Sequence, residues 1–296
     1  ILVIPDKESE MEEMEEEKIN PDLARLDERF LDKPGFAMEE CRSVAINMAR
    51  KSQKAMNLAI NLLGEYSDKT ADRVEKLENQ IDQYEDALGT YLVKLSGREL
   101  SIKDSRVLSV LLHCIGDFER ISDHAVNIRD AAVEMHKKDL EFSEKAKQEL
   151  NVFSNAIRDI VDRAVMAFET GDVELAKEVE PLEQVVDALN KEEKQRHINR
   201  LRTGACTIEL GFILSDISTN FERAADHCSN IAVCLLQIDE GGFDTHEYLD
   251  ILKEENSEEF RHEYMELSER YALPESKHTG KTAKTEKMEE SKDTGK

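Results

Sequence analysis

Apolar residues recur three and four positions apart along most of this 296-residue chain, a spacing that places them on one face of an α-helix. The pattern predicts helices over residues 37–66, 70–96, 104–138, 143–170, 173–202 and 206–239, with a weaker helical stretch over 245–271. Gly, Ser and Asp residues stand at the breaks, as expected for helix ends and turns. Pro181 lies inside the fifth range, so we expect a short helix to end near Val179 and a new helix to carry the proline near its first turn.

One segment of the chain occurs twice. Residues 117–128 read DFERISDHAVNI and residues 220–231 read NFERAADHCSNI, and seven of the twelve positions are identical. The helices before them also correspond, because LENQID at 77–82 aligns with LEQVVD at 182–187. Two helices therefore repeat almost in register, which indicates an internal duplication.

The predicted fold is all-α, with two tandem three-helix bundles over residues 37–139 and 143–239 and a C-terminal helical extension over 244–273. Both ends have a different composition, since acidic residues dominate the start and Lys, Glu, Thr and Ser dominate the end. Such segments bury too little apolar surface to offset the entropy lost on ordering. We expect an acidic segment and linker over 1–36 and a disordered tail over 274–296.

Charge and composition exclude several classes of function. The chain has 40 basic and 65 acidic residues, a formal charge of −25, whereas a nucleic-acid binder needs a clustered positive surface. No apolar stretch approaches the roughly 20 residues of a membrane span. The five cysteines have no regular spacing, which is typical of free thiols in a reducing compartment. No Ser/His/Asp or Cys/His arrangement or Gly-rich phosphate loop is recognisable, so the sequence does not indicate an enzyme.

Paired carboxylates recur in the repeated segments at Glu-x-x-x-Asp spacing. The pairs are Glu78/Asp82, Glu119/Asp123, Glu183/Asp187 and Glu222/Asp226. Residues four apart lie on one helix face about 6 Å apart, so both carboxylates of a pair can approach one cation. In a chain this acidic, chance gives on the order of 14 acidic pairs at this spacing. The recurrence at matched positions of both repeats is therefore the informative signal.

Helical phase places Glu119 in an apolar stripe with Leu108 and Ile115. A buried carboxylate is costly unless it is protonated, paired with a basic side chain or bound to a metal. Oxygen ligands suit hard cations such as Fe³⁺, Mn²⁺, Mg²⁺ and Ca²⁺. The residues leave two interpretations open, which are a metal site and an internal ion pair of Glu119 with Arg120 or Arg223.

Two further polar features are not expected to form a metal or anion site. His124 and His227 follow the aspartates of the two motifs but lie about 140° around the helix from the glutamates, so they are not expected to share a metal with them. Residues 191–202 (KEEKQRHINRLR) are locally basic, and a solvated helix face is favoured over a contact with an anion or phospholipid.

The segments 117–128 and 220–231, each at the centre of a three-helix unit, resemble the signature of the PhoU family, and the resemblance covers residues 37–239. Members of that family are twin three-helix bundles implicated in phosphate homeostasis, whose Glu/Asp-x-x-x-Asp motifs can hold metal ions. The resemblance implies a bound metal ion, iron or another hard cation such as Mn or Mg. The residues implied as its ligands are Glu78, Asp82, Glu119, Asp123, Glu183, Asp187, Glu222 and Asp226.

The flanks resemble segments of bacterial Na/Pi-cotransporter family proteins, at residues 26–41 (LDERFLDKPGFAMEEC) and 246–273. This implies a regulatory domain of a sodium-dependent phosphate cotransporter on the cytoplasmic side of the cell membrane. The implied partner is a membrane-embedded phosphate transporter segment of the same polypeptide, and the apolar start at residues 1–4 agrees with a cut after a last membrane helix. A second copy in a homodimer is a further partner to test.

Three alternatives stay open from the sequence. The first is a free-standing PhoU-type accessory protein of a phosphate transporter. The second is a di-metal carboxylate enzyme in a helical bundle, such as a di-iron oxidase, which metal content and oxygen consumption would reveal. The third is a metal-free helical scaffold, in which replacing Glu119 and Asp123 by amides would leave metal content unchanged.

Overall fold

The computed structural model describes residues 20–240 and 258–274, and every regular element in these residues is helical. The all-α prediction is therefore confirmed. Two 3-10 helices, η1 (Leu23–Arg25) and η2 (Glu28–Asp32), come first. The α-helices are α2 (Pro34–Gly64), α3 (Asp68–Ser96), α4 (Ile102–Lys137), α5 (Glu144–Thr170), α6 (Val173–Lys177), α7 (Val179–Arg202), α8 (Ile208–Glu240) and α10 (Glu258–Arg270).

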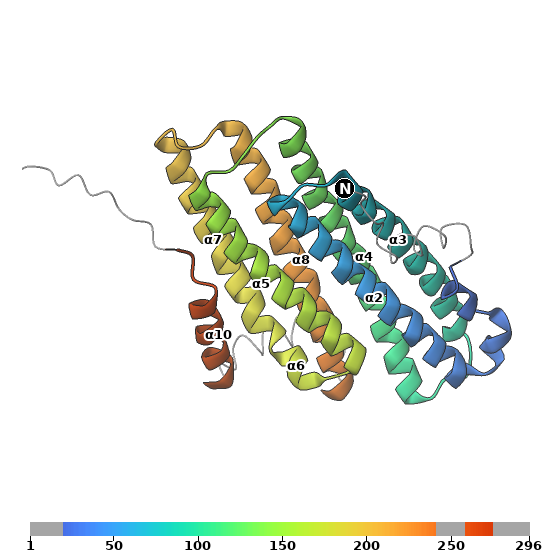
Figure 1. Ribbon diagram of the computed structural model, residues 1–296. Helices are drawn as coiled ribbons and strands as arrows, with labels where there is room; N and C mark the ends of the chain where they lie inside the picture. Colours follow the sequence, from blue (N-terminus) through green and yellow to red (C-terminus); the bar gives the residue numbers. More distant parts are fainter. Residues whose placement is uncertain (1–19, 241–257, 275–296) are drawn as a thin grey trace, which may run out of the picture.

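The helices form two units that lie side by side (Figure 1). Helices α2, α3 and α4 make the first unit, and α5, α7 and α8 with the short α6 make the second. Helix α4 packs along α8 and α2 packs along α5, so two helix pairs join the units. Phe118 and Phe221 hold the same position in the repeat and are both fully buried. Their rings contact Phe168 and Phe153 of α5 at centroid distances of 5.0 and 5.2 Å, so α5 contributes to the core of both units.

Local sequence explains the break between α5 and α7. Helix α5 ends before Gly171, whose φ of 70° lies in the left-handed region that favours glycine. The Asp172 side chain then accepts hydrogen bonds from two backbone N–H groups of α6, at 3.0 and 3.1 Å. Helix α7 begins at Val179 and carries Pro181 in its first turn, where the missing N–H has no helical partner to lose. The predicted split of this range is confirmed.

The segment before α2, expected to be a linker, packs on the first unit over residues 20–33. Leu31 of η2 is 4% exposed, and the Tyr91 hydroxyl on α3 donates a 2.9 Å hydrogen bond to the Asp27 carbonyl. The Tyr84 hydroxyl donates to an Asp22 carboxylate oxygen at 2.5 Å. Apolar residues in 20–36 therefore find a surface on the first unit, a long-range contact that composition alone does not reveal. Residues 1–19 lie outside the described residues.

The predicted C-terminal extension is described only from residue 258. Helix α10 packs against α7, and its Leu267 is 3% exposed. Glu263 forms a 3.1 Å ion pair with Arg163 of α5, and the Tyr271 hydroxyl donates a 2.8 Å hydrogen bond to Asp159. Residues 241–257 and the predicted tail after residue 274 lie outside the described residues.

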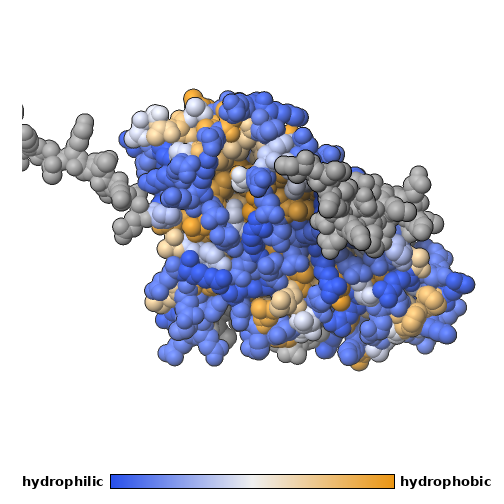
Figure 2. All heavy atoms as spheres, in the orientation of Figure 1, coloured by the Kyte–Doolittle hydropathy of each residue, from blue (hydrophilic) through white to orange (hydrophobic). Residues whose placement is uncertain are grey.

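The face shown in Figure 2 is mostly hydrophilic, as expected for a chain with 35% charged residues. Apolar surface gathers in the upper middle of this view, over the ends of α2 and α4 and the start of α5. The same three helix ends line the cavity described below.

Candidate metal centres

The first set of predicted ligands lies along the seam between α3 and α4. Glu78 and Asp82 are on α3, beside buried Leu77 and Ile81, while Glu119 and Asp123 are on α4. The Glu119 side chain is 21% exposed and that of Asp123 is 32% exposed. The four carboxylates therefore sit at the edge of the core, where the apolar stripe of each helix meets water.

Burial, and after it repulsion between neighbouring acids, raises the pKa values of Glu78, Asp82 and Glu119 in this seam. Burial raises the pKa of Glu119 to about 7, and the Asp123 carboxylate adds to the increase. The pKa of Asp82 is raised by burial and then by Asp123 of the facing helix. The same two causes, burial first and neighbouring acids second, raise the pKa of Glu78. Arg120 offsets part of the repulsion through ion pairs of 3.3 Å to Glu119 and 3.1 Å to Asp123.

The second set of predicted ligands lies in the same way between α7 and α8. Glu183 and Asp187 are on α7, and Glu222 and Asp226 are on α8. Burial raises the pKa of Asp226, and the carboxylates of Glu222 and Asp187 raise it further. A cation forms an ion pair in this seam, because Lys191 Nζ lies 3.0 Å from Asp187 Oδ2. The two seams thus have matched acids but different basic partners, one on α4 and one on α7.

The donor chemistry of the seams fits a hard cation, because carboxylates from two facing helices share each seam. Asp123 raises the pKa of Asp82 across the first seam, and Asp187 raises that of Asp226 across the second. The side chains do not surround a common point, since no three His, Cys, Asp or Glu residues in the described part of the chain are arranged to hold a metal ion. The ion pair of Glu119 with Arg120, expected by the alternative interpretation, is present. Metal binding therefore stays a prediction.

The repeated histidines have a role that the sequence analysis missed. His124 Nδ1 lies 2.9 Å from Asn220 Oδ1, and Asn127 Nδ2 donates to the same oxygen at 3.0 Å. Since this oxygen accepts both hydrogen bonds, His124 carries its proton on Nδ1. The contact joins α4 of the first unit to α8 of the second.

The second repeat makes the same contact in the opposite direction. His227 Nδ1 lies 2.9 Å from Asp117 Oδ1, and Asn230 Nδ2 donates to that oxygen at 3.3 Å. The two imidazole rings stack at a centroid distance of 5.6 Å. We call this set the histidine junction; it comprises Asp117, His124 and Asn127 with Asn220, His227 and Asn230. The spacing i, i+7, i+10, which puts three residues on one helix face, is the signal that could have revealed it.

The basic run at residues 191–202 is a solvated helix face only in part, because Lys191 and Arg202 are exposed whereas two of its arginines turn inward. The side chains of Arg196 and Arg200 are 16% and 11% exposed. Both form ion pairs with Glu149 of α5, whose side chain is fully buried, and the distance is 2.8 Å for Arg196. Arg200 also pairs with buried Glu193 at 2.9 Å. These arginines point inward because the acids with which they pair, Glu149 and Glu193, are buried between the helices.

The family model for the PhoU domain matches the chain twice, over residues 45–132 and 150–235. The first match falls in α2–α4 and the second in α5–α8, so the duplication inferred from the repeat corresponds to the two units. The chain is 25% identical over 189 residues to phosphate-specific transport system accessory protein PhoU homolog 1 of Thermotoga maritima, covering 64% of this chain and 81% of the relative. It is 25% identical over 219 residues to the Pseudomonas aeruginosa homolog, covering 74% and 90%.

Solved structures of the same family have the same fold. The crystal structure of PhoU from Pseudomonas aeruginosa aligns with a TM-score of 0.65 at 23% identity, over 69% of this chain and 97% of that one. The phosphate transport system regulatory protein PhoU from Streptococcus pneumoniae aligns with a TM-score of 0.63 at 17% identity, over 71% and 99%.

These comparisons correct the predicted partner. The chain matches 81% and 90% of the length of relatives that are named accessory proteins of a phosphate-specific transport system. A membrane-embedded transporter segment of the same polypeptide was therefore the wrong partner to predict, and the accessory-protein alternative is better supported than the cotransporter domain. Within residues 20–240 and 258–274, no helix is both long and apolar enough to cross a membrane. Because the family model matches more than half of the chain, once in each three-helix unit, the chain belongs to the PhoU domain family.

Proposed function

We propose that this chain is a regulatory accessory protein of a phosphate-specific transport system and that it acts by binding rather than by catalysis. The observation that carries the proposal is the match of both units to relatives named for that role, over most of their length. The helical scaffold supports it, because the polar side chains shared by the two repeats serve to join helices or gather carboxylates.

The test is phosphate uptake in intact cells that lack the gene for this chain. We expect uptake at high external phosphate to change when the gene is deleted and to return when the wild-type chain is supplied. A matched pair of cultures with and without the transport system would show whether the effect needs that system. Unchanged uptake in the deletion strain would refute the accessory role.

We further propose that each seam binds a hard metal cation, iron or Mn or Mg, through its two carboxylate pairs. In the first seam Glu78, Asp82, Glu119 and Asp123 would hold the ion, and its charge would replace the attraction now supplied by Arg120. In the second seam Glu183, Asp187, Glu222 and Asp226 would do so, with Lys191 displaced from Asp187. The raised pKa values support this proposal, because a cation would relieve the repulsion that contributes to them.

Elemental analysis of protein purified without chelator tests the metal proposal. We expect Glu119→Gln with Asp123→Asn to lose the metal of the first seam. Asp130→Asn with Glu134→Gln is the matched control, because these two acids are also four apart on α4 but are exposed and pair with Arg129 and Lys138. Equal metal content in all three proteins, or none in the wild type, would leave the carboxylates as ordinary ion pairs. Oxygen consumption by the metal-loaded protein would favour the di-metal enzyme.

A further inference from the structure

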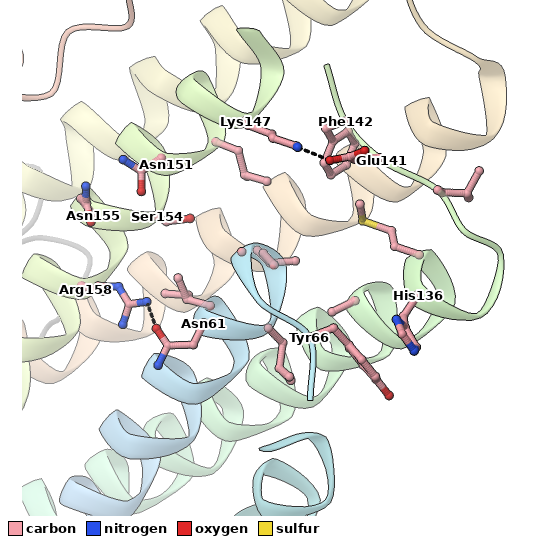
Figure 3. A pocket seen from close by; sticks show the side chains of 18 of the residues that line it. Asn61, Tyr66, His136, Glu141, Phe142, Lys147, Asn151, Ser154, Asn155 and Arg158 are labelled. Atoms are coloured by element: carbon pink, nitrogen blue, oxygen red, sulfur yellow. Dashed lines mark hydrogen bonds and ion pairs between the residues drawn. The ribbon is translucent and has the colours of Figure 1, made fainter. Parts of the chain in front are cut away.

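A cavity of about 580 Å³ opens between the two units, where α2 and α4 end and α5 begins (Figure 3). This volume lies in the range of small-molecule sites. Apolar side chains form much of its wall, among them Leu62 of α2, Leu150 of α5 and Phe142 of the connection between the units. At one side the Tyr66 and His136 rings stack at 4.0 Å between centroids.

Arg158 of α5 is the unusual group in this wall. Its guanidinium donates to Asn57 Oδ1 at 2.6 Å, to the Asn57 carbonyl at 3.3 Å and to Asn61 Oδ1 at 2.8 Å. These acceptors are neutral, and Arg158 forms no ion pair within the described part of the chain. Asp162 lies close enough to raise the pKa of Arg158 against the larger, lowering effect of burial, but its carboxylate accepts a hydrogen bond from Gln53.

Several other poorly exposed arginines of this acidic chain hold carboxylates. Arg163 pairs with Asp159, Glu178 and Glu263, and Arg196 pairs with Glu149. A half-buried guanidinium that bonds only to neutral oxygens keeps a full positive charge to offer to a ligand. Arg158 therefore differs from its neighbours in having charge that no acid of the described residues neutralises by contact.

The hydrogen-bond donors and the acidic residues of the cavity wall lie in different parts of the cavity. Asn151, Ser154 and Asn155 line it from the same helix as Arg158, and Figure 3 shows Asn61 across from them on α2. Their amide and hydroxyl groups can donate to an anion. The acids of the wall, Asp139 and Glu141, come from the connection between the units, where Glu141 pairs with Lys147.

We propose that this cavity binds a small organic anion, with a phosphate or carboxylate group on Arg158 and an apolar body against Leu62, Phe142 and Leu150. The planar guanidinium can form two parallel hydrogen bonds with either kind of head group. The apolar wall favours a ligand that carries an apolar group over a bare inorganic ion, because burying that group is favourable. Arg158 already reaches from the second unit to Asn57 and Asn61 of the first. A ligand there contacts both units, so its binding stabilises their packed arrangement.

Calorimetric titration with four probes tests this proposal. Phenyl phosphate and phenylacetate carry the two head groups on an apolar ring, inorganic phosphate is a head group alone, and benzyl alcohol is a neutral ring. We expect at least one of the two aromatic anions to bind roughly tenfold more tightly than either partial probe, and Arg158→Gln to weaken it roughly tenfold, or about 1.4 kcal/mol. Whichever anion binds identifies the head group.

Two further variants separate loss of binding from loss of folding. Asn155→Asp keeps Arg158 and places a carboxylate three residues before it on α5, where it competes with the anion for the guanidinium, so it also weakens binding of the anion. Arg106→Gln is the matched control, because Arg106 is an exposed arginine of α4 outside the cavity, and it leaves binding unchanged. Failure of both aromatic anions to bind the wild type at millimolar concentration would overturn the proposal. Equal binding by Arg158→Gln and the wild type, or equally tight binding of inorganic phosphate, would do so as well.

Discussion

Replacing Glu149 by Gln tests the buried ion cluster of the second unit. The Glu149 side chain is fully buried and binds Arg196 and Arg200, so the substitution removes the negative charge from two poorly exposed guanidinium groups at once. Breaking a buried pair on one side costs about 3 to 5 kcal/mol. Arg200 keeps Glu193 and Arg196 keeps Glu192, so we expect the lower end, about 3 kcal/mol.

Far-UV circular dichroism during urea and thermal unfolding measures this loss. For a chain of this size, about 3 kcal/mol corresponds to a melting temperature lower by about 6 to 12 °C. Glu144→Gln is the matched control on the same helix, because Glu144 is 85% exposed and pairs with Lys147 at 3.2 Å. It should cost less than about 0.5 kcal/mol. A loss under about 1 kcal/mol for Glu149→Gln would refute the reasoning, since the cluster would then be compensated by water or by relaxation of the arginines.

The remaining predictions concern pH, one hydrogen-bond partner and one glycine. In metal-free protein the pKa of Glu119 is about 7, whereas a glutamate in an unfolded chain has a pKa of about 4.5. The contribution of Glu119 to stability is therefore fully present below pH 4.5 and is lost as the pH rises through 7. Glu119→Gln should therefore be more stable than the wild type at pH 8 by about 1 to 3 kcal/mol and equal to it near pH 4, as urea unfolding at both pH values would show; a difference independent of pH would contradict this. Burial lowers the pKa of His124. Asn220→Asp should raise this pKa, because it places a carboxylate beside the imidazole ring, and NMR titration would measure the shift. No shift would mean that the ring does not face position 220. Gly211→Ala should destabilise by about 1 to 3 kcal/mol, because its Cβ would lie 2.6 Å from His197 Nε2, whereas Gly89→Ala, with no heavy atom nearer than 3.9 Å, should stabilise by about 0.5 to 1 kcal/mol in the same unfolding assay.

The helices and their pairing into two units could be predicted from the sequence, because apolar periodicity and the repeat are local or internal signals. The seams of Glu78 and Glu119 followed from the same repeat, since helices that recur together pack together. The inward direction of Arg196 could not be predicted in this way. Its partner Glu149 is 47 positions earlier in the chain, and a charged residue on a helix is ordinarily assigned to water.

The structured segment before α2 was missed for a related reason. Its stability depends on Tyr84 and Tyr91, which hold Asp22 and the Asp27 carbonyl across more than 60 positions of sequence. Composition indicates how much apolar surface a segment can bury by itself. It does not indicate whether the segment becomes ordered by packing on the surface of another part of the chain. The role of His124 was missed because the repeat shows which residues share a helix face but not which helix that face contacts. Here it contacts the other copy of the repeat.

The histidine junction has a consequence for how the two units can move. Each acceptor lies on the helix opposite its donors, so all four hydrogen bonds depend on one relative position of α4 and α8. A helix advances about 1.5 Å per residue, so a slide by one residue would break both halves together. The duplicated segment thus forms two equivalent contacts between α4 and α8, and both depend on the same register of the two helices. A shift of one unit along the other would therefore remove all four hydrogen bonds together rather than one after another.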